Sequence, residues 1–377
     1  MRILYIARYH TVTAERKIAL LAGEPDMDVW LVRPRRWRDE HGSSDLPVRA
    51  GQPHHTVAVP LVFQPGDPHR CLYGTFSFAM TSVRPDIVHV EEEPDSLAAL
   101  QVAAVRRLVA PRARLVLSTW QNVDRAKRRQ VWWVLRTTLR QADAVLCANR
   151  EAQALLGSFG YRGDARVLPP QGVDLDVFYP RRPERAADDT PFTVIYVGRL
   201  VPEKGVNLLI DAMGALGGSS RLVLIGGGPS RASLEARASD LALGDRVQFA
   251  GAMSPMELAE QLRRSDVLVL PSLSTPVWKE QFGRALVEAM ACGLPVVGSD
   301  SGAIPEVVGD AGLIFPEGDI PALTGCLERL AASPELRVEL GERGRLRVAR
   351  MYSQERIASR TAAFYRLLVE ERDDRDD

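Results

Sequence analysis

Two glutamates stand close together in the part of the sequence with the clearest chemical pattern. Glu280 and Glu288 are separated by seven residues, and the stretch 285–292 is apolar at every position except Glu288. A helix of that composition is buried nearly all round. A carboxylate inside it needs hydrogen-bond partners, because burying an unpaired charge is costly. Either Arg284, one turn earlier, or a pair of hydroxyls on a ligand could fill that role.

Glu280 precedes the same helix, which is predicted over 283–292 and is ended by Gly293 and Pro295. A carboxylate at this place can simply complement the positive end of the helix dipole. It can also hold a ligand, since Gly283 has no side chain and lets a ligand approach the backbone. Both interpretations are open.

Two cations follow a run of β-forming residues at 193–197. They are Arg199 and Lys204, and ligands of open α/β sheets bind beyond the carboxyl ends of the strands. Two cations there, facing a free helix N-terminus near Gly283, would hold a diphosphate without a metal ion. The alternative is a surface salt bridge, for example with Glu203.

These residues need elements that hold them, and the sequence predicts two sets of buried strands separated by helices. In the first half, strands are expected at 3–7, 29–32, 87–90, 114–118 and 144–148, with helices at 96–109 and 125–141. In the second half, strands are expected at 193–197, 221–225, 246–249, 267–270 and 295–298, with helices at 206–216, 230–241, 255–264 and 283–292. This alternation predicts an α/β protein with two Rossmann-like, doubly wound domains.

A linker is predicted between the two halves. The segment 179–191 is rich in proline and charge and has no apolar periodicity. The expected domains are therefore 1–178 and 192–352, and a chain of 377 residues has the length of two such domains. Residues 353–377 are expected to form a helix that returns to the first domain, followed by an acidic tail.

The motifs of the second half resemble those of retaining GT-B glycosyltransferases of the family-4 type. Glu280 and Glu288 match the EX7E pattern of that family. Further matches, in the family's order, are Gly172-Val173-Asp174, Gly198-Arg199 with Lys204-Gly205, Gly226–Pro229 and 289–295. The resemblance covers most of residues 165–355.

The resemblance implies a nucleotide diphosphate sugar as donor, a UDP- or GDP-sugar, with retention of the anomeric configuration and neither cofactor nor metal. By this resemblance Arg199 and Lys204 bind the donor diphosphate, and Glu280 holds the transferred sugar. These three residues would form the catalytic set. Glu288 would bind the ribose. The backbone contacts to sugar and phosphate would come from Gln281, Phe282 and Gly283.

The first half, the expected acceptor domain, resembles the family in its alternation of strands and helices. It departs from the family at two places. Many members have a glycine pair after the first strand, but this chain has none in the corresponding segment 7–16. Many members also carry a histidine that the corresponding segment of this chain, 118–122, lacks. Glu92 and Glu93 end another strand and could meet acceptor hydroxyls, with a solvated loop as the alternative. The candidate acceptor-binding residues are His10, Glu92, Glu93, Thr119 and Gln121.

Composition argues against several other classes. The 48 basic and 48 acidic residues cancel, so no overall field favours a nucleic acid. The four cysteines have no zinc-binding spacing, and neither a leader peptide nor a long apolar span is evident, so a cytoplasmic enzyme is expected.

Two further motifs are interpreted as not functional in other ways. The glycine-rich turn at 226–230 resembles a dinucleotide-binding fingerprint, but Arg231 replaces the third glycine, which argues against an oxidoreductase. Two Asp-x-Asp pairs are interpreted as structural rather than metal-binding: Asp26 with Asp28, and Asp174 with Asp176.

One basic stretch, Arg125–Arg136, combines cations with Trp132 and Trp133. Such a composition can rest on an anionic membrane surface, which makes weak peripheral membrane contact one hypothesis. The favoured alternative is a helix that buries one of the tryptophans in the core.

Two rival function classes fit the same patterns. One is a sugar-nucleotide epimerase or phosphorylase on the same fold, and the other is a catalytically silent nucleotide-binding protein. A second sugar acceptor is needed by a transferase and by neither rival.

Overall fold

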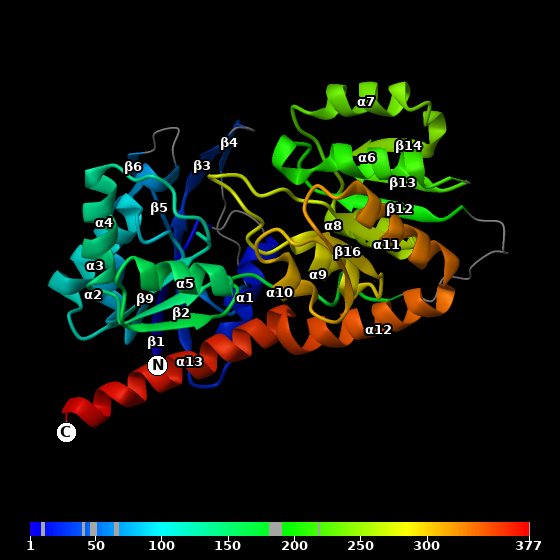
Figure 1. Cartoon of the computed structure of the whole chain (residues 1–377). Helices are drawn as coiled ribbons and strands as arrows, with labels where there is room; N and C mark the ends of the chain where they lie inside the picture. Colours follow the sequence, from blue (N-terminus) through cyan, green and yellow to red (C-terminus); the bar gives the residue numbers. More distant parts are fainter. Residues whose placement is uncertain are drawn as a thin grey trace. The chain divides into compact units, whose positions relative to one another are not determined.

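The computed structural model of the chain describes the backbone of residues 1–8, 12–39, 42–45, 51–63, 68–180, 191–217 and 219–376. It divides into two compact units, one formed by Met1–Gly172 with Gln354–Asp377 and the other by Val173–Ser353 (Figure 1). They are called the N-terminal and the C-terminal unit below.

The N-terminal unit is built on a seven-stranded sheet in the order β11-β10-β9-β8-β1-β2-β5. Its neighbouring strands all pair in parallel. The strands are β1 (Arg2–Ile6), β2 (Asp28–Pro34), β5 (His55–Val59), β8 (Ile87–Val90), β9 (Arg114–Thr119), β10 (Ala144–Cys147) and β11 (Asp164–Val167). Two short antiparallel pairs lie outside this sheet, β3 (Arg36–Asp39) with β4 (Gly42–Asp45) and β6 (Leu61–Phe63) with β7 (Leu72–Tyr73). The strand order reverses between β1 and β8, and doubly wound sheets bind ligands at such a point.

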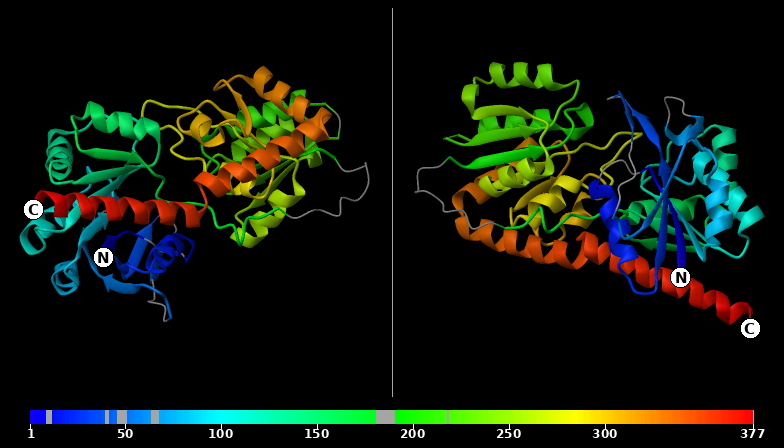
Figure 2. Two further views of the ribbon diagram at one scale, coloured as in Figure 1. Left: turned by 90° about the horizontal axis from the view of Figure 1, so that it is seen from below. Right: turned by 180° about the vertical axis from the view of Figure 1, so that it is seen from behind.

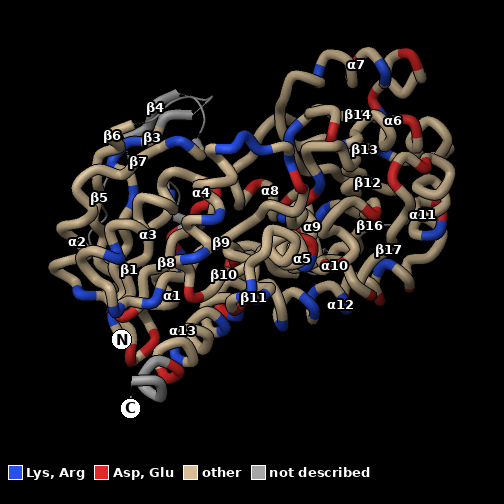
Figure 3. Tube along the Cα trace, turned by 60° about the vertical axis from the view of Figure 1, so that its left-hand side comes forward, with Lys and Arg blue, Asp and Glu red and all other residues tan. Residues whose placement is uncertain are grey.

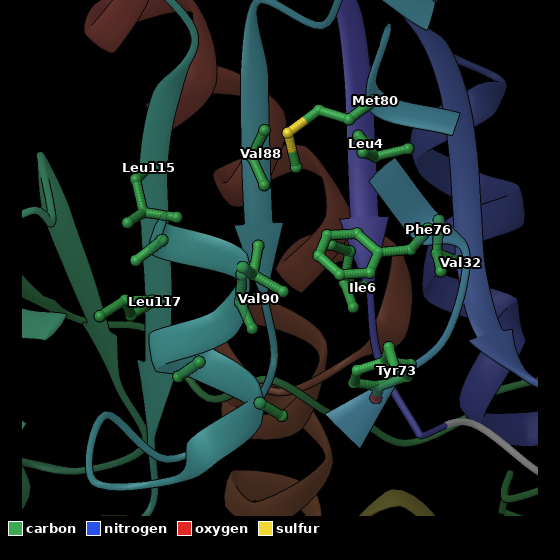
Figure 4. Packing of buried hydrophobic residues seen from close by; sticks show 14 of the residues in the cluster. Leu4, Ile6, Val32, Tyr73, Phe76, Met80, Val88, Val90, Leu115 and Leu117 are labelled. Carbon is green, nitrogen blue, oxygen red and sulfur yellow. The ribbon is translucent and has the colours of Figure 1, made fainter. Parts of the chain in front are cut away.

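Helices cover both faces of this sheet. One face shares an apolar cluster (Figure 4) with helices α2 (Phe76–Val83), α3 (Leu97–Val109), α4 (Arg129–Leu139) and α5 (Arg150–Ser158). The other face packs against α1 (Val12–Ala22) and α13 (Gln354–Asp376). Helix α4 begins at Arg129 rather than at Arg125 as predicted, and its N-cap residue Arg128 makes no side-chain capping hydrogen bond.

Helix α13 belongs to the N-terminal unit although it ends the chain (Figure 2). Ala358, Ala362 and Tyr365 lie in the same apolar cluster as residues of β1. The Tyr365 hydroxyl contacts Nδ1 of His89, whose Nε2 lies 2.8 Å from the Ser118 hydroxyl. These contacts join the last helix to the ends of β8 and β9.

The C-terminal unit has a six-stranded sheet in the order β14-β13-β12-β15-β16-β17, again with parallel pairs throughout. The strands are β12 (Thr193–Val197), β13 (Arg221–Ile225), β14 (Val247–Gly251), β15 (Val267–Leu270), β16 (Val296–Ser299) and β17 (Gly312–Phe315). The helices are α6 (Val206–Ala215), α7 (Arg231–Asp240), α8 (Pro255–Arg264), α9 (Arg284–Ala291), α10 (Ile304–Val308), α11 (Ile320–Ala332) and α12 (Pro334–Met351). Two parallel, helix-covered sheets confirm the predicted fold class.

Candidate functional site

The C-terminal unit brings Lys204 and Glu280 together, although 76 positions separate them in the sequence. The ammonium of Lys204 donates to Oε2 of Glu280 at 2.5 Å, and the Ser272 hydroxyl donates to the same oxygen at 3.0 Å. Glu280 is 7% exposed and Ser272 is fully buried. A buried carboxylate is thus matched by one cation and one hydroxyl, as its burial requires.

Two glycines allow this arrangement by letting backbone segments meet. Gly205 has φ +61° and follows Lys204, and a Cβ at this position would lie 2.0 Å from the carbonyl oxygen of Pro271. Gly302 has φ +52°, and a Cβ there would lie 2.2 Å from the carbonyl oxygen of Glu280, which also accepts a hydrogen bond from the Ala303 amide at 2.9 Å. Any larger residue would push the chain away from the glutamate.

The two predicted diphosphate-binding cations differ in their surroundings. The Lys204 side chain is 15% exposed and lies over the ring of Trp278, with Nζ 4.8 Å from the ring centroid. The Arg199 side chain is 62% exposed, and its guanidinium lies 4.0 Å from the Glu203 carboxylate. The surface salt bridge considered from the sequence is therefore long and involves Arg199, whereas Lys204 pairs with Glu280.

Glu288 lies on α9 and is 5% exposed. Nε of Arg284, one turn earlier, donates to Oε1 of Glu288 at 2.8 Å. Burial raises the pKa of this carboxyl, and Arg284 opposes that rise. The structure therefore contains the Arg284 pair that the sequence left open, and among the described residues no hydrogen bond reaches the second carboxylate oxygen.

The entrance of α9 has no side-chain cap. Gly283, with φ +74°, precedes the helix, so the first backbone N–H groups have no capping partner among the described side chains. The Phe282 ring is buried against Tyr352, with the ring centroids 5.6 Å apart. At Gln281, Phe282 and Gly283 a ligand would accordingly meet backbone N–H groups rather than the phenylalanine ring.

In the N-terminal unit, Glu92 and Glu93 follow β8 and point to different partners. Glu92 is 2% exposed and accepts from Nε of Arg8 at 2.7 Å and from the Tyr73 hydroxyl at 2.9 Å. Burial raises its pKa to about 7, against the opposing effect of Arg8. The solvated-loop interpretation is therefore wrong for Glu92.

Glu93 binds two neutral donors that follow or end β9. Its carboxylate accepts from the Thr119 hydroxyl at 2.6 Å and from the Trp120 backbone amide at 2.7 Å. Burial raises the pKa of Glu93 to about 7. The backbone amide of Gln121 donates to the Thr119 hydroxyl at 3.2 Å, whereas its side-chain amide donates to the carbonyl of Val123 at 3.1 Å. His10, the remaining acceptor candidate, lies outside the described residues.

Several polar residues that the sequence did not single out complete these networks. Arg8 and Tyr73 hold Glu92, Ser272 holds Glu280, and Lys17 lies 3.2 Å from the Glu91 carboxylate. Arg8 and Ser272 could have been found by one signal, because each is a polar residue that closely follows a predicted buried strand. Tyr73 carries no such signal.

Neither aspartate pair gathers metal ligands. Asp26 pairs with Arg366, and Asp174 accepts from the Asp176 amide at 3.0 Å. No cluster of three or more His, Cys, Asp or Glu with metal-binding geometry occurs in the described part of the chain. In the same residues no helix is long and apolar enough to span a membrane.

Both halves of the chain match models of glycosyltransferase families. Residues 25–177 match the model described as Glycosyltransferase Family 4, and residues 180–347 match Glycosyl transferases group 1.

Curated proteins and solved structures agree with these matches. The GDP-mannose-dependent alpha-(1-6)-phosphatidylinositol monomannoside mannosyltransferase of Mycolicibacterium smegmatis is 34% identical over 231 residues, 56% of this chain and 60% of that protein. The protein of the same name from Mycobacterium tuberculosis H37Rv is 30% identical over 287 residues, 70% of this chain and 74% of that protein. Among solved structures, sucrose-phosphate synthase from Thermosynechococcus elongatus matches with a TM-score of 0.74 at 22% identity, covering 98% of this chain and 100% of that chain.

The two parallel α/β units and this structural match define the class, the glycosyltransferases with the GT-B fold. Within that class, the chain belongs to glycosyltransferase family 4, which confirms the resemblance found in the sequence. The chain spans 60% and 74% of the lengths of the two curated relatives.

Proposed function

We propose that this protein transfers a hexose from a nucleoside diphosphate sugar to an acceptor hydroxyl with retention of anomeric configuration. The observation that carries the proposal is the buried Lys204–Glu280–Ser272 network beside the uncapped start of α9. It combines a positioned cation, a positioned carboxylate and a helix start that has no side-chain cap. A sugar diphosphate needs all three.

On the donor side, Arg199 and Lys204 bind the diphosphate. An ammonium has three N–H donors, so Lys204 can keep its bond to Glu280 and still donate to a phosphate oxygen. The backbone of Gln281–Gly283 adds N–H groups at the positive end of α9. Glu288 takes the ribose hydroxyls through its second carboxylate oxygen.

During transfer, the acceptor oxygen bonds to the anomeric carbon while the bond from that carbon to the diphosphate breaks. The acceptor proton passes to a phosphate oxygen on the same face of the sugar. The protein's part is to stabilise the departing diphosphate with Arg199, Lys204 and the start of α9. Glu280 holds the sugar as positive character develops at its anomeric carbon. The reaction needs neither a cofactor nor a metal ion.

The acceptor belongs to the N-terminal unit in this proposal. Glu93 and Thr119 are the first residues to test there, since Glu93 follows β8, Thr119 ends β9 and the two are hydrogen-bonded to each other; His10, Glu92 and Gln121 complete the candidate set. The two curated relatives are described as GDP-mannose-dependent enzymes acting on phosphatidylinositol monomannoside. We therefore propose GDP-mannose as donor and a mannosylated phosphatidylinositol as acceptor, with the reaction on the cytoplasmic side and the 125–136 segment in contact with the membrane.

The test uses the purified full chain with GDP-mannose and phosphatidylinositol monomannoside, and with UDP-glucose as the competing donor. We expect a mannolipid product whose new linkage has the anomeric configuration of the donor by proton NMR, together with a higher melting temperature in GDP. A changed donor sugar formed without acceptor would instead identify an epimerase. A thermal shift without any product from GDP-, UDP-, ADP- or TDP-sugars would identify a silent nucleotide-binding protein.

A further inference from the structure

The outward sides of α2, α3 and α4 carry no acidic residue. None of the positions 76–83, 97–109 and 129–139 is Asp or Glu. The three helices lie side by side on one face of the N-terminal sheet, since each buries its inner side in the same apolar cluster (Figure 1). Their outer sides form one surface, called the α2–α4 face below.

Helix α4 presents a stripe of exposed residues on this face. Arg129, Trp133, Arg136 and Arg140 are all exposed and follow one another at spacings of four, three and four, which places them on one side of a helix. The opposite side of the helix is buried. Helix α3 adds the exposed pair Arg107 and Leu108 beside it. Lys and Arg are blue in Figure 3.

Arg107, Arg129 and Arg136 have no acidic partner among the described residues. Other exposed helix arginines do have an acidic partner on the same helix, as Arg231 does with Glu235 at 2.8 Å and Arg343 with Glu339 at 2.5 Å. Arg136 lies over the ring of Trp132, 5.3 Å from the ring centroid, and this contact does not neutralise its charge. The positive charge of the α2–α4 face is therefore open to an external anion.

Helix stability explains only part of this set of cations. Arg107 and Arg136 lie in the last turns of α3 and α4 and favour those helices, but Arg129 opens α4, where a cation opposes the helix dipole. Trp132 packs against Phe159, with ring centroids 5.2 Å apart, as the core-helix interpretation expects of one tryptophan. Trp133 does not pack in the core, because it is 62% exposed.

Large apolar side chains are exposed on α2 and α3 as well. Phe78 on α2 is 76% exposed and Leu108 on α3 is 81% exposed. A surface that offers both arginines and apolar side chains suits the boundary of an anionic bilayer, where phosphates and acyl chains meet. The backbone of a nucleic acid would use the arginines but not the leucine or phenylalanine.

We propose that the α2–α4 face docks on an anionic lipid bilayer, with its arginines on the lipid phosphates and Trp133, Leu108 and Phe78 in the headgroup layer. The docking extends the proposed function, since it would hold the enzyme at a lipid-linked acceptor, but it requires no sugar transfer.

The test is sedimentation of the full chain with vesicles of phosphatidylcholine alone and of phosphatidylcholine mixed with phosphatidylglycerol. The parent should bind the mixed vesicles and lose binding as salt is raised. Arg129→Glu with Arg136→Glu should weaken binding by roughly 25-fold or more, from about fivefold for each arginine lost. Trp133→Ser should weaken binding to the mixed vesicles severalfold. The matched control, Arg343→Glu with Arg345→Glu on α12, changes the net charge equally and should bind as the parent does.

Equal binding to both vesicle types, no binding to either, or an equal loss in the control variant would overturn the proposal. So would tighter binding to an oligonucleotide than to mixed vesicles at the same salt concentration. The thermal shift by GDP is measured on every variant. If the α4 variant keeps that shift and loses vesicle binding, the docking is established separately from the donor site. If the parent sediments with mixed vesicles but transfers no sugar, the proposed function fails and the docking surface stands.

Discussion

The candidate-site carboxylates of the two units are held in different ways. In the C-terminal unit, Glu280 meets the ammonium of Lys204 at 2.5 Å and Glu288 meets Arg284 at 2.8 Å. In the N-terminal unit, Glu93 accepts from a hydroxyl and a backbone amide, and burial raises its pKa to about 7. Even Glu92, with Arg8 at 2.7 Å, has its pKa raised to about 7 because burial outweighs the arginine.

This difference separates two tasks. The pair of Lys204 and Glu280 is already formed, so it can act electrostatically without rearranging when the diphosphate departs. A carboxyl that changes protonation near neutral pH can take or release a proton. We therefore expect substitutions in the C-terminal unit to change donor binding and turnover, and those in the N-terminal unit to change the response to pH.

The largest expected effect is on turnover in Glu280→Gln. The variant keeps the shape of the side chain but removes its charge beside the developing positive carbon, so kcat should fall about a hundredfold or more. GDP binding by calorimetry should stay close to the parent value. Loss of GDP binding with unchanged kcat would show that Glu280 serves the nucleotide, and the distinction between the two glutamates would have to be reversed.

Removing the cations should have the next largest effect. Lys204→Ala and Arg199→Ala should each weaken GDP binding and slow turnover by roughly tenfold or more, because charge-assisted bonds contribute about 1.5–3 kcal/mol. The loss should be greater for Lys204, which also leaves Glu280 buried without its cation, than for the exposed Arg199. Arg231→Ala on α7 is the control for an exposed arginine paired to a glutamate. Parent-like binding in both variants would remove these residues from the donor site.

Glu288→Gln should affect binding more than chemistry. The ribose contact is made equally before and during transfer, so KM for the donor should rise up to about tenfold with a smaller change in kcat. Arg284→Ala tests the same carboxylate from its other side and should raise KM less, because its side chain is half-exposed. A fall in kcat at constant KM would contradict the ribose assignment.

Ser272→Ala should have a smaller effect of the same kind as Glu280→Gln. The hydroxyl positions Oε2 of Glu280 at 3.0 Å, and one such bond contributes about 1 kcal/mol, so kcat should fall roughly fivefold at constant KM. The variant Ser272→Thr keeps a hydroxyl at this position and should therefore recover part of the loss. Equal losses in both variants would point to packing instead of positioning.

The sequence predicted the buried parts of the sheets well and their edges poorly. Strands such as β8 and β15 are continuous apolar runs because both of their faces are covered. The edge strands β5, β11 and β17 were missed, and all three are only partly buried. The edge strand β14 was predicted at 246–249, close to its observed range. Most edge strands therefore leave little mark in this sequence.

In the candidate site, the sequence identified residues better than their pairings. Arg284 and Glu288 lie one helical turn apart, so that pair could be considered from spacing alone. The pairs of Lys204 with Glu280 and of Arg8 with Glu92 join residues from different strand ends. Only the order of strands in each sheet brings them together, and no local pattern encodes that order.

The smallest expected effect is on stability, and it tests the N-terminal side of the comparison. Because burial raises the pKa of Glu93 from 4.5 to about 7, the folded protein holds this proton more tightly than the unfolded chain does. The stability that this provides is present at low pH and is lost as the pH rises from about 4.5 through about 7. Glu93→Gln cannot ionise, so between about pH 5 and pH 8 its melting temperature should fall less than that of the parent, by a few degrees or about 1 kcal/mol. Glu257→Gln, an exposed carboxylate whose pKa is lowered by the Ser254 hydrogen bonds, should not reduce the fall. Parallel melting curves for Glu93→Gln and the parent across this range would mean that Glu93 is ionised throughout, and the contrast between the two units would then rest on geometry alone.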